Sequence, residues 1–93
     1  MMYGAIDLHL RYSELRVVEA DGRVVRERRV VTSRETLTAA CAGLGELRIV
    51  HGVGKGVLRS AVERHLKGHP QVAEQRLGQF GEGGRGVTVA KLR

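Results

Sequence analysis

The sequence contains no tryptophan, one phenylalanine and two tyrosines among its 93 residues. With so few aromatic side chains, the core must be built from aliphatic residues, and its richness in valine favours β-strands. Apolar residues make up 42% of the chain and charged residues 28%, which is the balance of an ordinary globular protein. A chain of this length is expected to form a single domain, residues 1–93, around one modest core.

Cysteine and long apolar runs are also scarce. The one cysteine, Cys41, excludes an internal disulfide and a cysteine-based zinc site, and its place in an apolar helical pattern predicts a buried thiol. No apolar run approaches the roughly 18 residues that a membrane-spanning helix needs, and no signal peptide is recognisable. We therefore expect a cytoplasmic chain with no membrane partner.

The excess of positive charge lies entirely in the second half of the chain. Residues 1–46 carry seven arginines and seven acidic residues, whereas residues 47–93 carry nine lysines and arginines against three glutamates. A basic half is typical of a protein that binds a polyanion, usually nucleic acid. General solubility is the alternative explanation of the same charge.

Apolar periodicity and turn residues predict the element order βββαβαββ. Strands are expected at residues 2–10, 13–20, 23–31, 47–50, 72–77 and 86–92. Asp21-Gly22 stands between the second and third strands and predicts a type I′ hairpin turn, in which both central residues have a positive φ.

Two helices are expected between these strands. Thr32, three residues before Glu35, matches a capping box at the start of the first helix, and the second helix spans about residues 57–67. Two right-handed crossovers would place both helices on the same face of the sheet. The predicted fold is therefore an α/β two-layer sandwich with one mixed sheet and both helices on one face.

Asp7 and His9 lie two residues apart in the first predicted strand, so they point to the same side of the sheet. If the first and fourth strands are parallel neighbours, their carboxyl ends also bring His51 close, at the edge where open α/β sheets bind ligands. Histidine can act as a general acid or base, and Asp7 could hold a divalent cation, Mg²⁺ or Mn²⁺, or orient His9. These three residues are the predicted catalytic set of a phosphodiester-cleaving site; an exposed polar pair at a strand end is the alternative for Asp7 and His9.

Two glycine-rich loops could bind a ligand. Residues 51–56 precede the second helix, whose first N–H groups are available to an anion, and Lys55 adds a positive charge. The spacing matches neither a P-loop nor a dinucleotide-binding fingerprint. Residues 78–86 could close over a ligand and place Glu82 or Arg85. For both loops the alternative is a tight turn without a binding role.

The second half of the chain resembles the C-terminal part of an Smr (small MutS-related) domain over about residues 47–93. The resemblance rests on His51-Gly52 with Gly54 and Gly56, on Leu58-Arg59, and on the run from Gly81 to Val89. It implies nucleic-acid binding, and DNA- or RNA-nicking endonuclease activity, with Lys55 one place later than the lysine usual in that loop. The residues it implies for nucleic-acid binding are Gly52, Gly54, Lys55, Gly56, Arg59 and Arg85.

The first half departs from this pattern. Asp7-Leu8-His9 matches part of the Leu-Asp-x-His-Gly motif of the Smr family, but Leu10 stands where glycine is expected and a hairpin replaces a long helix. Residues 2–50 instead resemble the start of insertion-sequence transposases with a RuvC-like, ribonuclease H-type domain. In that family Asp7 would be the first metal-binding acid, but His51-Gly52 stands where the next acid is expected.

The two resemblances together suggest a chimera, designed or recombined, with a transposase-like portion (residues 1–46) and an Smr-like portion (residues 47–93). Three functions remain open: a working Smr-like nuclease, a nucleic-acid-binding module without catalysis, and a fold chimera with no retained activity. Weak, salt-sensitive binding is the most robust expectation, since it needs mainly positive charge. The sequence leaves the oligomeric state open.

Overall fold

The computed structural model describes residues 1–93 as six strands, two α-helices and one short 3-10 helix. In chain order they are β1 (Met2–Leu8), β2 (Tyr12–Glu19), β3 (Val24–Val31), α1 (Arg34–Ala40), β4 (Glu46–Val50), α2 (Val57–Leu66), β5 (Val72–Leu77), the 3-10 helix η1 (Gly84–Gly86) and β6 (Val87–Leu92). The predicted order βββαβαββ is confirmed, with boundaries that differ by a few residues. Neither helix is long and apolar enough to cross a membrane.

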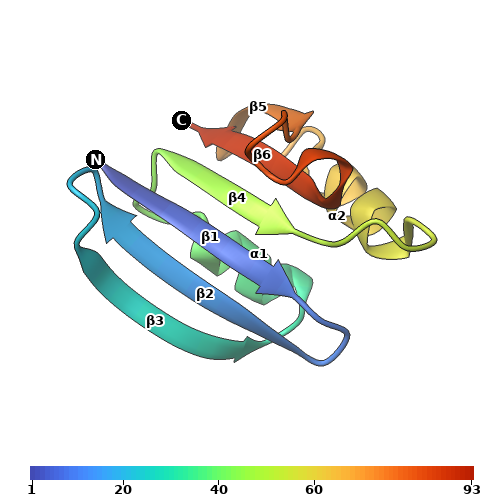
Figure 1. Cartoon of the computed structure of the whole chain (residues 1–93), viewed down its shortest axis with the longest axis horizontal. Coiled ribbons are helices and arrows are strands. Elements are labelled where there is room, and N and C mark those ends of the chain that lie inside the picture. The colour runs from blue at the N-terminus through green and yellow to red at the C-terminus, as the bar shows by residue number, and fades with distance from the viewer.

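The strands form one mixed sheet in the order β3-β2-β1-β4-β6-β5 (Figure 1). β1 runs parallel to β4, with Ile6 opposite Ile49, and antiparallel to β2, while β6 lies between β4 and β5 and is antiparallel to both. α1 connects β3 to β4 and α2 connects β4 to β5, and both helices lie behind the same side of the sheet (Figure 1). We call this side the helix face and the other side the open face; the predicted two-layer arrangement is confirmed.

The core fills the space between the helix face and the two helices. Its 14 buried residues come from both helices, from the turn that follows α1, and from alternate positions of the strands, such as Ile6, Leu47 and Ile49, which are at most 1% exposed. This alternation follows from the two-residue repeat of a strand. Cys41 belongs to this cluster, and burial raises the pKa of its thiol, so the predicted buried thiol is confirmed.

The start of α1 differs from the predicted capping box. Ser33, not Thr32, is the N-cap, and its hydroxyl accepts a hydrogen bond from the N–H of Thr36 at 3.1 Å. The Thr32 hydroxyl instead donates to the carbonyl of His9 at 2.6 Å and lies 2.6 Å from the Ser13 hydroxyl. A tertiary contact between the β1–β2 turn and the start of α1 has therefore taken Thr32 away from the local capping role.

The β2–β3 hairpin also turns differently from the prediction. Gly22 has a φ of 88°, but Asp21 does not have a positive φ, so the turn is not of type I′. The N–H of Gly22 donates to the carbonyl of Glu19, and the N–H of Glu19 donates to the carbonyl of Arg23. Those bonds close a three-residue loop that ends on a left-handed glycine, the next most common hairpin geometry.

The two ends of the chain meet at Gly45. Its N–H donates to the carbonyl of Met2 at 2.9 Å, and its carbonyl accepts from the N–H of Leu92 at 3.0 Å. Both termini therefore lie at one end of the sheet, opposite to the carboxyl ends of β1 and β4 (Figure 1).

At Gly4 the core packs directly against the backbone of β1. A Cβ atom there would lie 2.5 Å from a methyl carbon of Leu44 and 3.0 Å from one of Leu47. We expect Gly4→Ala to lower the free energy of unfolding by about 1–3 kcal/mol, the usual cost of overpacking a core, as measured by urea denaturation. Ala5→Ser, which adds one atom on the open face of the same strand, is the control; equal stability of the two variants would contradict the close packing.

Candidate functional site

The two glycine-rich loops, residues 51–56 and residues 78–86, meet beside the carboxyl end of β4. The carbonyl oxygen of Gly86 accepts hydrogen bonds from the N–H of His51 at 2.9 Å and from the N–H of Gly52 at 3.0 Å. A Cβ atom on Gly86 would lie 3.6 Å from the Cα of Gly52, so the two backbones pass in close contact. Two loops that are far apart in the sequence are thus bonded to each other at the end of β4.

His51 is buried on the helix face, with 7% of its surface exposed. Its Nδ1 lies 3.0 Å from the carbonyl oxygen of Gly52, and its Nε2 lies 2.8 Å from the Thr88 hydroxyl. A carbonyl can only accept, so Nδ1 carries the proton, and in the neutral ring Nε2 accepts a hydrogen bond from Thr88. Both ring nitrogens are therefore engaged in holding the loop against β6.

Asp7 and His9 form a pair at the other side of the sheet. His9 Nε2 lies 3.3 Å from Asp7 Oδ2, and both side chains are exposed. The expected parallel pairing of β1 and β4 is confirmed, but Ile6 and Ile49 point into the core, so Asp7 points to the open face. His51 lies on the helix face with Thr88, so the three residues do not form the single cluster expected from strand order. Their catalytic roles stay predictions.

The start of α2 offers backbone donors and positive charge. Gly56 caps the helix with a φ of 79°, and no side chain accepts a hydrogen bond from its first turn. The guanidinium of Arg59 folds back over Gly56, 3.4 Å from where a Cβ would stand. Gly52 and Gly54 also have positive φ values, which explains why glycine occupies these positions.

Three cations near these loops have no acidic partner. The ion pairs of the chain do not include Lys55, Arg59 or Arg85. Unpaired cations next to free N–H groups at a helix start make a suitable place for a phosphate group.

A groove of about 560 Å³ lies between α2 and β5. Arg59, Glu63 and Lys67 form its helical wall, and Thr88, the partner of His51, is part of its lining. The groove thus extends from the start of α2 to the residue that fixes His51, with two lysine or arginine side chains against one glutamate on the helical wall.

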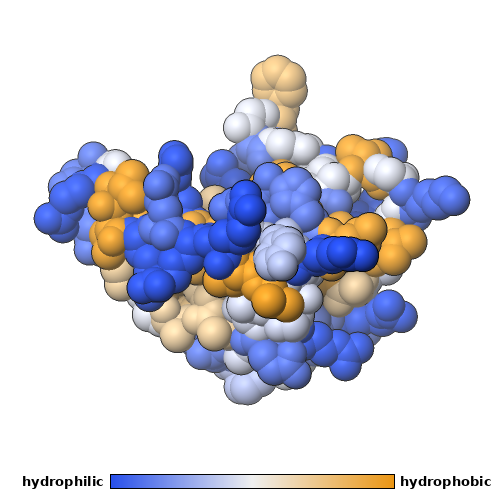
Figure 2. Space-filling model, turned by 90° about the horizontal axis from the view of Figure 1, so that it is seen from below, coloured by the Kyte–Doolittle hydropathy of each residue, from blue (hydrophilic) through white to orange (hydrophobic).

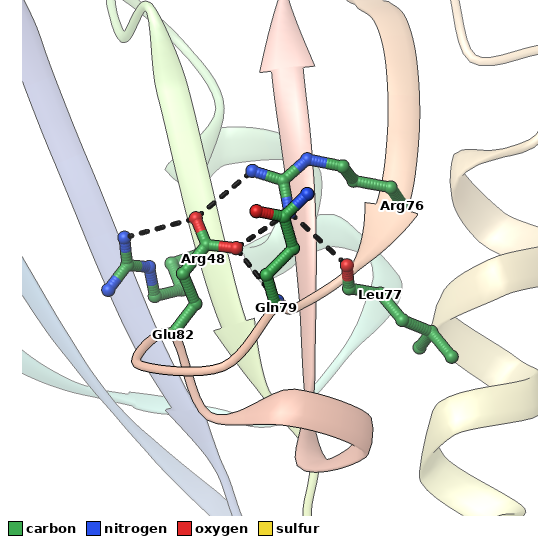
Figure 3. A network of polar contacts seen from close by, with 5 residues as sticks. All are labelled: Arg48, Arg76, Leu77, Gln79 and Glu82. Carbon is green, nitrogen blue, oxygen red and sulfur yellow. Dashed lines mark hydrogen bonds and ion pairs between the residues drawn. The ribbon is translucent and has the colours of Figure 1, made fainter.

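Glu82 fastens the loop of residues 78–86 to the open face (Figure 3). Its carboxylate accepts two hydrogen bonds from the Arg76 guanidinium, at 2.7 and 3.0 Å, and one from the N–H of Gln79 at 2.8 Å. Arg48 approaches the same carboxylate at 3.9 Å. The hydrogen bonds from Arg76 and Gln79 hold the pKa of Glu82 at about 2.

This clamp covers part of the open face. Val87 and Val89 point toward the open face, yet they are only 4% and 3% exposed. Gly83 lies against Val87 so closely that any side chain at that position would overlap it. Sequence reasoning proposed that the loop places Glu82, but it missed both arginine partners and Thr88. A lone threonine on the core side of a valine-rich strand was the one available clue.

The structure gathers no metal site at the predicted position. Asp7 is a single carboxylate that pairs with His9, and no group of three or more His, Cys, Asp or Glu side chains is placed to hold a metal ion. Mg²⁺ usually keeps several waters and is held by one or two carboxylates together with substrate phosphates, so a Mg²⁺ or Mn²⁺ site at Asp7 stays a prediction.

Comparison with known proteins identifies a family and several relatives of this chain. The Smr domain model matches residues 6–93. Endonuclease MutS2 of Clostridium botulinum (strain Loch Maree) is 56% identical over 55 residues, which are 59% of this chain and 7% of that protein. Endonuclease MutS2 of Clostridium novyi is 50% identical over 68 residues, 72% of this chain and 9% of that protein. The chain thus spans less than a tenth of the length of the curated relatives it matches.

A solved structure agrees with these matches. The crystal structure of the Smr domain of Thermus thermophilus MutS2 is 43% identical, with a TM-score of 0.57 over 63% of this chain and 75% of that chain. The family match spans residues 6–93 and thus includes residues 47–51. It therefore gives no support to a join there, or to a transposase-like origin of the first half.

The clamp at Glu82 predicts a specific pH dependence. Because its pKa is about 2 rather than the usual 4.5, the ionised carboxylate stabilises the folded loop above pH 4.5. That contribution falls as the pH drops through 4.5 toward 2. In NMR titrations of the folded protein we expect the Gln79 amide to follow Glu82 with a midpoint near pH 2, and Glu82→Gln to abolish the response. Glu74→Gln, a carboxylate of β5 outside the ion pairs, is the control; titration of Glu82 near 4.5 would refute the clamp.

Proposed function

The chain belongs to the Smr domain family, and from this membership we propose that it binds the phosphate backbone of nucleic acid and nicks one strand. The proposal rests on the joint that Gly86 makes between the two glycine-rich loops. The joint holds the loop of residues 51–56 next to the start of α2, where Lys55 and Arg59 stand, and it holds Arg85 one residue away from the contact. The MutS2 relatives are named endonucleases.

Binding is the better-supported half of the proposal. A phosphate at the start of α2 would accept hydrogen bonds from the uncapped N–H groups of the first turn, and the positive end of the helix dipole would favour its charge. Arg59 folds over that position, and Lys55 precedes it. Lys67 also lines the groove along α2 and would provide a second contact for the same strand.

Cleavage would use the exposed pair at the end of β1. Asp7 holds Nε2 of His9 at 3.3 Å, which leaves Nδ1 free to take a proton. In hydrolysis, His9 would remove a proton from the attacking water as the new P–O bond forms and the bond to the leaving oxygen breaks, and solvent would protonate that oxygen. Asp7 would orient the ring and stabilise its charged form. His51 would act by holding the loops in place, since both of its ring nitrogens are engaged.

Binding without cleavage is the second candidate. The observation that favours it is the position of the Asp7–His9 pair on the opposite face of the sheet from His51 and the groove. A backbone bound along α2 would have to pass around the carboxyl ends of β1 and β4 to reach His9.

The first test is the salt dependence of binding. Each phosphate contact releases counterions, so removing one contacting cation should lower the slope of log K against log salt by about 0.9 for duplex DNA. We expect this change for Lys55→Ala and for Arg59→Ala, measured by fluorescence anisotropy. Arg29→Gln removes a cation that pairs with Glu14 on β2 and β3, and it should leave the slope unchanged. Binding that is flat between low and high salt would exclude the backbone contact.

The second test is nicking of supercoiled DNA and of structured RNA. His9→Ala should reduce the rate by about 100-fold or more, the usual contribution of general acid–base catalysis, while binding stays intact. His69→Ala, a histidine that accepts a hydrogen bond from the N–H of Gln71, is the control. Parallel reactions with Mg²⁺, Mn²⁺ and EDTA test the predicted cofactor. No nicking by the unmodified protein under any of these conditions would leave binding as the function.

A further inference from the structure

Phe80 is exposed more than any other large apolar side chain of the protein. Its exposed fraction is 107% of the reference value, whereas the next, Leu10, reaches 83%. It is also the only phenylalanine in the sequence. Figure 2 shows a face of mixed hydropathy, from which one apolar side chain projects clear of the rest. Because the one phenylalanine lies outside the core, its presence is not explained by a role in folding.

Phe80 stands at the corner of a defined turn. The N–H of Glu82 donates to the carbonyl of Gln79 at 2.8 Å, which closes a four-residue turn. Gly81, the third residue, has a φ of 89°, as a type II turn requires. Phe80 is the second residue of this turn.

The turn is fixed to the sheet by the Glu82 clamp. The same carboxylate binds the N–H of Gln79 inside the turn and the guanidinium of Arg76 on β5 (Figure 3). Phe80 therefore lies between two residues that the clamp holds. Its exposure follows from a bonded turn and not from a loose loop.

We propose that Phe80 stacks on an unpaired base of the nucleic acid that the protein binds. This inference rests on the proposed function and names its substrate class: a single strand, or a duplex with a loop, bulge or tail. Every base presents a flat π-face to an aromatic ring, so such stacking tolerates any sequence. Arg85, exposed and unpaired, lies in the same loop, and Gly86 joins that loop to residues 51–56.

The surroundings of Phe80 argue against a protein partner. Apart from Phe80, residues 78–86 are glycines and polar or charged residues. Docking sites for proteins place an aromatic anchor at the centre of a packed, desolvated patch. Within its own loop the ring lies among glycines and polar or charged side chains, which matches a base-stacking position instead.

The absence of tryptophan allows a direct test. Phe80→Trp creates the only indole of the protein, and we expect its fluorescence to be quenched when an oligonucleotide with a single-stranded tail is added. Val25→Trp is the matched control, because Val25 is exposed on β3, at the opposite edge of the sheet from β5. Quenching of both indoles to the same extent, or of neither, would overturn the stacking.

Affinity measurements separate this inference from the proposed function. Phe80→Ala should weaken binding of the tailed oligonucleotide by about tenfold, the effect of one lost stack, and leave a blunt duplex unaffected; Phe80→Tyr should restore affinity. If the unmodified protein binds neither oligonucleotide at low salt, the proposed function fails and the stack fails with it. If it binds both and Phe80→Ala changes neither, or changes both equally, only the stack is wrong. A lower oligomeric state of Phe80→Ala in sedimentation, with unchanged affinity, would assign the ring to self-association.

Discussion

The carbonyl oxygen of Gly86 accepts hydrogen bonds from two successive N–H groups, those of His51 and Gly52. This one atom fixes the loop before α2, which begins at His51 directly after β4, relative to the loop before β6. His51 then reaches Thr88 on β6 and closes the joint from the core side. The joint therefore also sets the position of the start of α2, where the free N–H groups lie. A Cβ atom on Gly86 would lie at an ordinary contact distance, 3.6 Å, from the Cα of Gly52, so the two loops pass close to each other at this point.

Much of the fold follows from patterns that are local in the sequence. The alternation of apolar residues along strands and the 3/4 spacing along helices set the element order, and crossover handedness set the layers. Two predicted details were wrong, the N-cap of α1 and the type of the β2–β3 turn. The N-cap depends on residues distant in the sequence. Thr32 matched a capping box, but its hydroxyl bonds to His9 and Ser13 from another part of the chain. The Asp21-Gly22 pair indicated a hairpin correctly and its turn type incorrectly, because two loop lengths share those residues.

The sequence predicted which strand ends the candidate site residues occupy, but not which face of the sheet each side chain points to. Strand order placed Asp7 and His51 at neighbouring strand ends, and the parallel pairing of β1 and β4 confirms this. Which face each side chain takes depends on the register, and a shift of one residue reverses it. The chimera interpretation also came from local sequence patterns. The hairpin in the first half, where a long helix was expected, resembled another family. A family match that continues from Ile6 through the proposed join gives that interpretation no support.

The meeting of both chain ends at Gly45 has a consequence for how such a domain can be attached to larger proteins. Met2 and Leu92 lie on either side of Gly45, at the end of the sheet remote from the glycine-rich loops. A tether at either terminus, or at both, would leave the loops, the groove along α2 and Phe80 facing away from the point of attachment. The fold is thus suited to act as a module on a flexible arm, which explores the volume around its carrier with its basic end outward.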